Sequence, residues 1–348
     1  MTSPPHPEAA YEVLSRGVAD GVVPGGVAVV VDASGPGTVA VAGVRREGGP
    51  SVTADTRYDV ASLTKVMATL PSVLRLVADG RLDLDEPLAA HFSNAGWFQT
   101  PSLGDATSRQ LLAHTSGISN WTPLFAQVST RATALANVLQ ARVEAPGRAR
   151  YTDLGFMLLG ALVERLAKCR LDQFARKAVF EPLGLFDTRF GPVQGVPVAA
   201  TEECGWRGRL LEGEVHDENA SVWEGVAGHA GLFSTAHDVA AYASAWLRLD
   251  DRLGPATLLR ETWGLASEGE GGVRRGLGWL LAHPGVFSGA ASSGFGHTGF
   301  TGTSLWIDPS AGRASVLLTN RVHPHRSRGG GIAELRRRFH GAAHGWAS

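Results

Sequence analysis

The chain has 348 residues, of which 44% are hydrophobic and 19% charged, and its formal net charge is -1. This composition is typical of a globular protein, and the length allows one large domain or two lobes with sizeable cores. The near-zero charge gives no reason to expect a nucleic acid as a partner, and no apolar run reaches membrane-spanning length.

The cysteines and the first residues indicate the cellular compartment in which the protein is expected. Cys169 and Cys204 are the only cysteines, so we expect no disulfide framework. The first residues form neither a basic segment nor an apolar one, which predicts that this chain has no signal peptide. We therefore expect a cytoplasmic location, unless a leader was removed from a longer precursor.

The first 60 residues predict a helix followed by a β-hairpin. Residues 7–20 have apolar side chains at helical spacing, and the apolar, mostly β-branched run 27–31 is typical of a buried strand. A turn at residues 34–37 leads to a second strand at residues 38–42. Residues 51–58 are expected to form a short connection.

Helical patterns dominate from about residue 80 to residue 225. We expect a short capped helix within 107–117, and longer helices at 132–143 and 154–168. Residues 190–222 are rich in Gly and Pro and predict a long irregular excursion. A capping box at residues 234–238 then opens a helix that extends to about Leu247.

After about residue 274 the pattern returns to strands, at 277–281, 296–307 and 314–319, with a hairpin turn at 308–312. A last helix is expected at 332–344. The fold class is therefore α+β, an antiparallel sheet flanked by helices with an inserted helical lobe. Within one domain, we assign residues 1–80 and 225–348 to the sheet lobe and residues 81–224 to the mainly helical lobe.

Ser62 is followed three residues later by Lys65, which would place both side chains on one face of a helix. A serine hydroxyl needs a base to become a nucleophile, and a lysine whose charge is disfavoured by burial can be that base. The chain has only three lysines, and an arginine could not lose its proton. The pair therefore predicts a nucleophile and a base, although an N-cap serine beside a solvated lysine would give the same pattern.

Two further stretches complete a candidate site. Tyr151 and Asp153 follow a Pro-Gly break, and His297-Thr298-Gly299 begins an expected strand. A serine hydrolase needs a nucleophile, a proton shuttle and backbone donors for the oxyanion. Ser62, Lys65 and Tyr151 can supply the first two, and the strand edge near Gly299 can supply an N–H group opposite that of Ser62.

Together these residues resemble the serine β-lactamase and penicillin-binding-protein family, of the class C type that includes esterases and D-aminopeptidases. The resemblance covers most of the chain. The stretches that carry it are Ser62–Lys65, Leu111–Ile118, Pro146–Gly147, Tyr151–Phe156, Glu181–Leu185, Gly231–Thr235 and His297–Gly299.

The resemblance implies a β-lactamase/transpeptidase-like α/β sandwich with a helical lobe and a catalytic cleft between them. It implies an acyl-enzyme on Ser62, with Lys65 and Tyr151 as the proton shuttle. The N–H groups of Ser62 and Phe300 would form the oxyanion hole, and Thr298 and Gly299 would line the substrate strand. We expect no cofactor and no metal requirement, because the serine chemistry needs none.

The chain departs from the β-lactamase pattern at two positions, since Asp153 replaces an asparagine and His297 replaces a lysine. Histidine versions occur in D,D-peptidases and esterases of the family. Both changes lower the attraction for a substrate carboxylate, because an unperturbed histidine is mostly neutral at pH 7 and an ionised aspartate repels anions. Protonated His297 at pH 6, or Arg274 or Arg275, could restore that attraction. Asp153 could instead be the N-cap of the helix that begins at Leu154.

We therefore expect a serine hydrolase, namely an esterase, amidase or peptidase, that turns over simple esters faster than penicillins. The alternatives are a genuine β-lactamase or a penicillin-binding D,D-carboxypeptidase, and then a non-catalytic binding protein or a metal-dependent hydrolase. Its partner would be a small-molecule ester, amide or peptide. The exact substrate, the stereochemical preference and the oligomeric state do not follow from the sequence.

Several other residues have competing interpretations. His216, Asp217 and His229 invite a metal site, but their spacing matches no ligand motif and loop ordering is the better explanation. His114 is expected to hold a turn together through hydrogen bonds. Trp121 and Trp223 either line the pocket or belong to the core.

Overall fold

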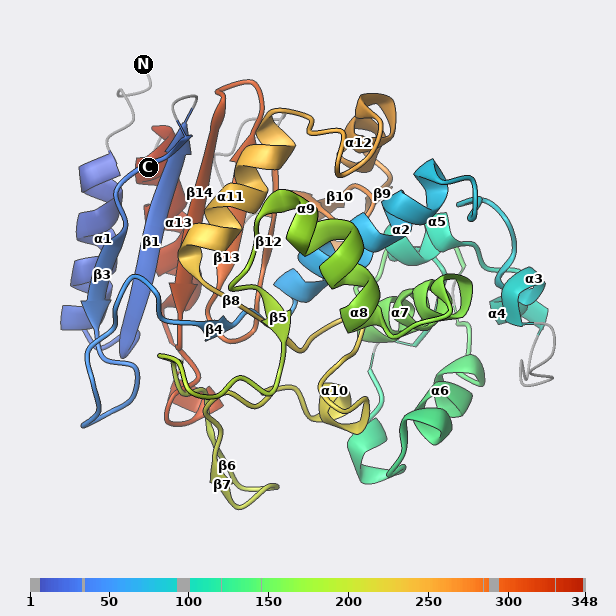
Figure 1. The fold of residues 1–348 in the computed structure, drawn as a ribbon, viewed down its shortest axis with the longest axis horizontal. Coiled ribbons are helices and arrows are strands. Elements are labelled where there is room, and N and C mark those ends of the chain that lie inside the picture. Colours follow the sequence, from blue (N-terminus) through green and yellow to red (C-terminus); the bar gives the residue numbers. More distant parts are fainter. Residues whose placement is uncertain are drawn as a thin grey trace.

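A nine-stranded antiparallel sheet, covered by helices on both faces, forms one side of the molecule (Figure 1). This statement concerns the part of the chain that the computed structural model describes, namely residues 7–32, 35–92, 101–119, 121–144, 146–283, 285–287, 294–328 and 330–346. The sheet consists of β1 (Gly25–Asp32), β2 (Gly35–Pro36), β3 (Ala40–Gly43), β9 (Ser267–Glu268), β10 (Arg274–Arg275), β11 (Leu280–Ala282), β12 (Phe295–Thr298), β13 (Ser304–Asp308) and β14 (Arg313–Thr319).

The strands lie in the order β2-β1-β14-β13-β12-β11-β10-β9, and β3 also pairs with β1. The first long strand and the last are therefore neighbours near one edge of the sheet, where Val29 lies opposite Val316. A separate three-stranded sheet contains β4 (Tyr58–Asp59), β8 (Leu232–Ser234) and β5 (Arg189–Phe190), and a small hairpin contains β6 (Glu203–Cys204) and β7 (Arg209–Leu210).

The helices fall into two groups, those that cover the sheet and those that lie beside it (Figure 1). The first group is α1 (Pro7–Ala19), α11 (Ala236–Leu247) and α13 (Ile332–His344). The second is α2 (Leu70–Ala78), α3 (Leu88–Phe92), α4 (Pro101–Gly104), α5 (Ser108–Leu112), α6 (Arg131–Leu139), α7 (Asp153–Ala167), α8 (Leu171–Ala175), α9 (Glu181–Leu183), α10 (Glu218–Val222) and α12 (Ala256–Thr262). Short π-helical turns occur at Lys65–Thr69 and Arg176–Phe180, and 3-10 turns at Leu124–Ala126, Glu270–Gly272 and Arg326–Arg328.

Side chains on the two faces of β1 belong to different cores. Ala28 and Val30 pack with α1 and α13, whereas Val27, Val29 and Val31 belong to the larger cluster that contains α11. Both faces of the strand are covered, which explains why apolar residues run through it without alternation. The larger cluster continues into the helical part through α2 and α7, so the sheet and these helices share one core.

The predicted α+β class is confirmed, and so is the order of strands, then helices, then strands. The last helix spans residues 332–344, as predicted. The strand expected at 296–307 is wrong as one element, because a turn at residues 299–303 separates β12 from β13. The turn expected at 34–37 lies partly outside the described residues, and β2 occupies residues 35–36.

The described helices include none that is both long and apolar enough to cross a membrane. We propose, from the chain order of the elements, that residues 1–80 and 225–348 form a sheet lobe and residues 81–224 a helical lobe. The three-stranded sheet connects the two proposed lobes, because β5 belongs to the helical lobe while β4 and β8 belong to the sheet lobe.

Candidate active site

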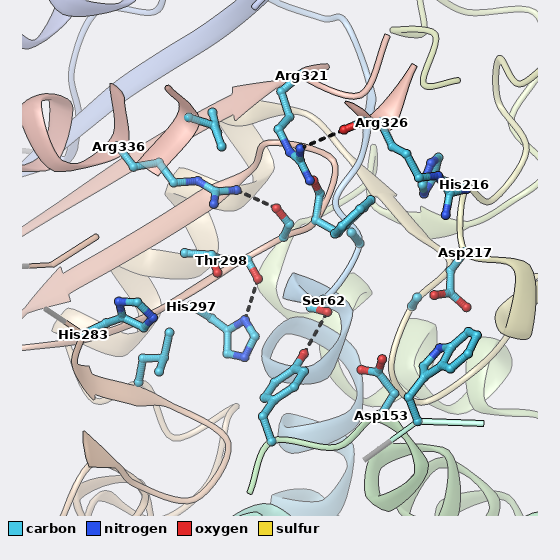
Figure 2. Close-up of a pocket in the computed structure, with 18 of the residues that line it drawn as sticks. Ser62, Asp153, His216, Asp217, His283, His297, Thr298, Arg321, Arg326 and Arg336 are labelled. Carbon is cyan, nitrogen blue, oxygen red and sulfur yellow. Dashed lines mark hydrogen bonds between the residues drawn. The ribbon is translucent and has the colours of Figure 1, made fainter. Parts of the chain in front are cut away.

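A pocket of about 580 Å³ contains seven of the eight residues that the sequence identified as a site (Figure 2). Ser62 lies near its centre, with His297 and Thr298 on one side and Asp153 on the other (Figure 2). The eighth residue, Lys65, is fully buried beneath it. The seven lining residues are Ser62, Tyr151, Asp153, His297, Thr298, Gly299 and Phe300.

The backbone presents Ser62 at a tight turn just before the helix. Ala61 has a positive φ of 48°, a conformation that costs free energy for a residue with a side chain. The N–H group of Ala61 donates to Asp59 Oδ1 at 2.8 Å, which holds this turn. The Lys65 N–H group donates to Ser62 O at 3.1 Å, which is the i to i+3 pattern of a 3-10 turn, and the π-helical turn begins at Lys65.

The structure brings the expected nucleophile and the two expected proton carriers together. Lys65 Nζ donates to Ser62 Oγ at 2.9 Å, and the Tyr151 hydroxyl lies 3.0 Å from the same oxygen. Lys65 reaches Ser62 across one turn, whereas Tyr151 comes from the loop before α7. Both distances are within hydrogen-bonding range, as general acid–base catalysis requires.

The charge of Lys65 differs from the sequence-based expectation. Burial alone would lower the pKa of Lys65, but the carboxylate of Asp153, whose Oδ1 is 2.7 Å from Nζ, raises it above the usual value of lysine. Lys65 Nζ also donates to the carbonyl of His229 at 3.2 Å. Burial does not leave a neutral lysine here, because Asp153 holds the ammonium form.

Asp153 is not the N-cap of α7, contrary to one of the two interpretations. Thr152 is the N-cap, and its hydroxyl accepts a hydrogen bond from Leu154 N–H at 3.2 Å. Asp153 is instead the first residue of the helix, and its side chain points to Lys65. The Thr152 N–H group donates to His114 Nδ1 at 3.2 Å. This bond holds the loop before α7 and confirms the prediction that His114 holds a turn through hydrogen bonds.

The Tyr151 side chain remains a neutral phenol in this environment. Burial raises the pKa of Tyr151, and the nearby charge of Lys65 offsets only part of that effect. The ring of His114 lies 4.7 Å from the Tyr151 ring, centroid to centroid, and supports it. The Tyr151 hydroxyl is therefore a hydrogen-bond donor to Ser62 Oγ in this site.

A turn between β12 and β13 is fastened to the strand that precedes Ser62. The hydroxyl of Thr301 donates to Asp59 O at 2.7 Å, and that of Thr303 donates to Val60 O at 3.0 Å. Phe300 lies within this turn and lines the pocket beside Ser62. Among the described residues, the N–H groups of Ser62 and Phe300 donate to no protein acceptor, so both remain available to an oxyanion.

Gly299 allows this close approach, and we predict that Gly299→Ala destabilises the protein. A Cβ atom would lie 2.1 Å from Thr303 Oγ1 and 2.4 Å from Val60 O, and the second of these is backbone. We expect a loss of about 2 kcal/mol in the free energy of unfolding, since overpacking costs about 1–3 kcal/mol, together with a lower kcat. Denaturant unfolding and steady-state kinetics measure both.

The matched control is Gly341→Ala, in the last turn of α13, where an added Cβ has no neighbour within 4 Å. Alanine is a better helix former than glycine, so this variant should gain about 0.5–1 kcal/mol. Equal effects of the two substitutions would contradict the proposed role of Gly299.

His297 is a neutral hydrogen-bond acceptor at the base of the pocket. Its Nδ1 lies 2.8 Å from the carbonyl of Thr298, so Nδ1 must carry the proton and Nε2 the lone pair. Burial, together with the charges of Lys65 and Arg275, lowers the pKa of His297 to about 3. His297 is therefore neutral from pH 6 to pH 8, and the expected anchoring by protonated His297 at pH 6 does not hold.

Four arginines line the described pocket, and only one of them was named from the sequence. Arg326 pairs with Glu202 and Glu218. Arg336 donates to the carbonyls of the 299–303 turn, and Arg321 donates to that of Phe300 (Figure 2). Arg275 faces the Tyr151 ring, whereas Arg274 is not part of the lining. Arg321, Arg326 and Arg336 follow the His297–Gly299 motif in the chain, and no spacing in the sequence indicates that they belong to the site.

The histidines that suggested a metal site are paired with different carboxylates. His216 Nε2 lies 2.9 Å from Glu202, and His229 Nε2 lies 2.9 Å from Asp217. In the described part of the chain, no group of three or more His, Cys, Asp or Glu side chains is arranged to hold a metal ion.

The structure places the two tryptophans in different environments. Trp121 is 57% exposed and lines the pocket, while Trp223 lies in the core.

Comparison with known proteins gives the family. Residues 12–337 match the sequence model of the Beta-lactamase family. The N-acetylmuramyl-L-alanine amidase of Bacillus subtilis (strain 168) is 30% identical over 77% of this chain and 68% of its own length. A protein provisionally named D-alanyl-D-alanine carboxypeptidase, from Salmonella gallinarum (strain 287/91 / NCTC 13346), is 31% identical over 78% of this chain and 71% of its own.

The fold also matches solved structures. The unliganded simvastatin synthase (LovD) from Aspergillus terreus, as its selenomethionyl derivative, superposes with a TM-score of 0.76 over 98% of both chains, at 22% identity. At that identity the likeness shows the fold alone. The family match extends over nearly the whole chain and the relatives are hydrolases, so the chain belongs to the Beta-lactamase family of serine hydrolases.

Proposed function

We propose that this enzyme hydrolyses an amide or ester bond through an acyl-enzyme on Ser62, and that its preferred substrate has a carboxylate close to the scissile bond. One observation carries the first part, namely that Ser62 Oγ lies within hydrogen-bonding distance of both Lys65 Nζ and the Tyr151 hydroxyl. Partly buried Arg275 in the same pocket supports the second part.

In this proposal Ser62 Oγ attacks the carbonyl carbon while its proton passes to Lys65. The carbonyl oxygen becomes an oxyanion and receives hydrogen bonds from the N–H groups of Ser62 and Phe300. Tyr151 then donates a proton to the leaving nitrogen or oxygen, and the carbon–leaving-group bond breaks. A water molecule enters the same position, and the same groups carry its proton as the acyl-enzyme is hydrolysed.

Arg275 is the best candidate for the carboxylate anchor. It has no carboxylate partner in the described part of the chain, and its buried Nη1 has no hydrogen-bond acceptor there. Burial lowers the pKa of Arg275, and the proximity of Tyr151 opposes that effect, yet a guanidinium keeps its charge at neutral pH. A buried cation without an anion is unfavourable, so a substrate carboxylate beside it would be stabilised.

We expect Arg275→Gln to weaken the hydrolysis of carboxylate substrates selectively. For a peptide that ends in a free carboxylate, kcat/KM should fall by about 10- to 100-fold, mainly through KM, because a charge-assisted hydrogen bond is lost. For a neutral nitrophenyl ester the change should stay within about threefold.

The control is Arg274→Gln, because Arg274 is the neighbour of Arg275 on β10 and does not line the pocket. It should leave both substrates unaffected. An equal loss on the peptide and the ester in Arg275→Gln would remove Arg275 from the role of anchor.

A neutral-ester hydrolase is the second candidate. It is favoured by the neutral state of His297, which stands where the β-lactamase pattern has a permanent cation. The exposed rings of Trp121 and Phe300 at the pocket could also receive an apolar acyl group. This candidate keeps the expectation that simple esters react faster than penicillins.

The two candidates are separated by a substrate panel. We would compare kcat/KM for a short-chain nitrophenyl ester, for nitrocefin, and for amide substrates that have a free carboxylate, including a D-Ala-D-Ala peptide. A preference for the amides supports the first proposal, which agrees with the names of the amidase and carboxypeptidase relatives. A preference for the ester, with nitrocefin slowest, supports the second.

A further inference from the structure

We propose that Asp153 is the proton-accepting partner of Lys65, and that it takes the proton which Lys65 must release before Lys65 can deprotonate Ser62. This inference rests on the proposed acyl-enzyme function. Asp153 acts through Lys65 and does not itself touch the bond that is broken. The argument depends on how the ammonium group of Lys65 is surrounded.

Three oxygen atoms surround Lys65 Nζ, two as hydrogen-bond acceptors and one as the partner of an ion pair. They are Ser62 Oγ at 2.9 Å, Asp153 Oδ1 at 2.7 Å and His229 O at 3.2 Å. The carboxylate of Asp153 raises the pKa of Lys65 against the effect of burial, so Lys65 keeps its ammonium form. The resting Lys65 is therefore a donor to Ser62, and it has no lone pair with which to take the serine proton.

Asp153 is the group in contact with Lys65 Nζ that can accept a proton. The His229 contact is a peptide carbonyl, which is not a base at neutral pH. The Tyr151 hydroxyl is already protonated. The carboxylate of Asp153 is 24% exposed, so the pocket side of the ion pair is hydrated while Lys65 is fully buried.

The proton count in the proposed step balances. Lys65 Nζ passes one proton to Asp153 Oδ1, which converts the ammonium–carboxylate pair into an amine and a carboxylic acid. The amine takes the proton of Ser62 as Ser62 Oγ bonds to the carbonyl carbon, and the π electrons move to the carbonyl oxygen. When the leaving group departs it takes a proton through Tyr151 from Lys65, and Asp153 returns its proton to Lys65.

The other charged or titratable groups around the pair come from several sides. Tyr151 and His114 lie on the loop side, His229 with its partner Asp217 on the opposite side, and His297 and Arg275 on the sheet side. Asparagine at position 153, the usual residue in the family pattern, could accept a hydrogen bond but not a proton. In this chain the amide would leave Lys65 to exchange its proton with solvent.

The test is the pH dependence of kcat/KM for a neutral nitrophenyl ester, from pH 5 to pH 10, in the wild-type enzyme and in Asp153→Asn. In the wild type Lys65 can pass its proton to Asp153 within the ion pair, so the rate should not rise with pH between pH 6 and pH 8. In the asparagine variant Lys65 must lose its proton to solvent, so the rate should rise by about tenfold per pH unit below the pKa of Lys65.

At pH 6 the asparagine variant should therefore be slower by about 100-fold or more, and the deficit should shrink steadily towards pH 9. Asp153→Glu keeps a carboxylate and should retain the flat profile at a reduced rate. Asp172→Asn, which removes a first-turn carboxylate from α8 outside the pocket, is the matched control and should leave the profile unchanged.

Each outcome decides the proposal. A loss in Asp153→Asn that is the same at every pH would assign Asp153 a packing role only and overturn it. A gain on nitrocefin with no change on the ester would show that Asp153 merely repels anions, and would also overturn it. If the asparagine variant does not fold, the wild-type profile decides, since a rate that rises about tenfold per pH unit from pH 6 to pH 8 would show that Lys65 loses its proton to solvent and would contradict the proposal. Failure of the proposed function is a separate result, namely no covalent label on wild-type Ser62.

Discussion

Ser62→Ala is expected to abolish both turnover and covalent labelling. The variant lacks the only hydroxyl that contacts Lys65 Nζ and the Tyr151 hydroxyl together among the described residues. Removal of the nucleophile from a group of catalytic residues typically lowers kcat by about 10⁴-fold or more, so residual activity should be close to background. Intact mass after incubation with a fluorophosphonate, a penicillin and a small ester reports the adduct.

Peptide mapping of the wild-type adduct should place the label on Ser62. Ser15→Ala is a suitable control, because Ser15 lies on α1 and its hydroxyl donates to the carbonyl of Tyr11. This variant should label and turn over like the wild type. A label on another residue, or an active Ser62→Ala enzyme, would refute the acyl-enzyme assignment.

The second large effect is expected for Lys65 and Tyr151, which should behave as one unit. We expect Lys65→Ala and Tyr151→Phe each to lower kcat/KM by about 10³-fold, and the double variant to be no more than about tenfold worse than the poorer single variant. The reason is that both side chains act on the same oxygen, Ser62 Oγ. Once one has been removed, the other has little left to contribute.

Two controls accompany this double-mutant cycle. Lys177→Ala removes an exposed lysine, and Tyr11→Phe removes a hydroxyl that donates to Thr38 O on the far side of the sheet. Lys65→Ala also leaves Asp153 without its cation, so the free energy of unfolding must be measured beside the kinetics. Single losses that multiply in the double variant would contradict a shared proton relay.

Local patterns predicted most elements of the fold. The last helix occupies residues 332–344, as expected, and it ends at Gly345, whose φ of 67° suits a helix C-terminus. The buried run 27–31 lies within β1, and Thr107 with Gln110 forms a complete capping box at α5. These features depend on residues within a few positions of one another, which is why periodicity and capping rules found them.

The candidate site was predictable in part for the same reason. Ser62 and Lys65 are neighbours on one turn, so their contact follows from local geometry. Tyr151 lies 89 positions from Ser62, and the residues alone did not distinguish it from a packing tyrosine. The order of the motifs, together with the family resemblance, singled it out before the structure placed it beside Ser62.

By itself, the sequence determined the α+β class, and it predicted Ser62 as the nucleophile together with the residues that surround it. Only the tertiary structure decided the charge states in the site. Asp153 holds Lys65 as an ammonium, His297 is a neutral acceptor, and Arg275 is left without a carboxylate among the described residues. The pKa of a buried group depends on which charges and dipoles surround it, and here these come from segments far apart in the chain. Residue spacing along the chain contains no information about that environment.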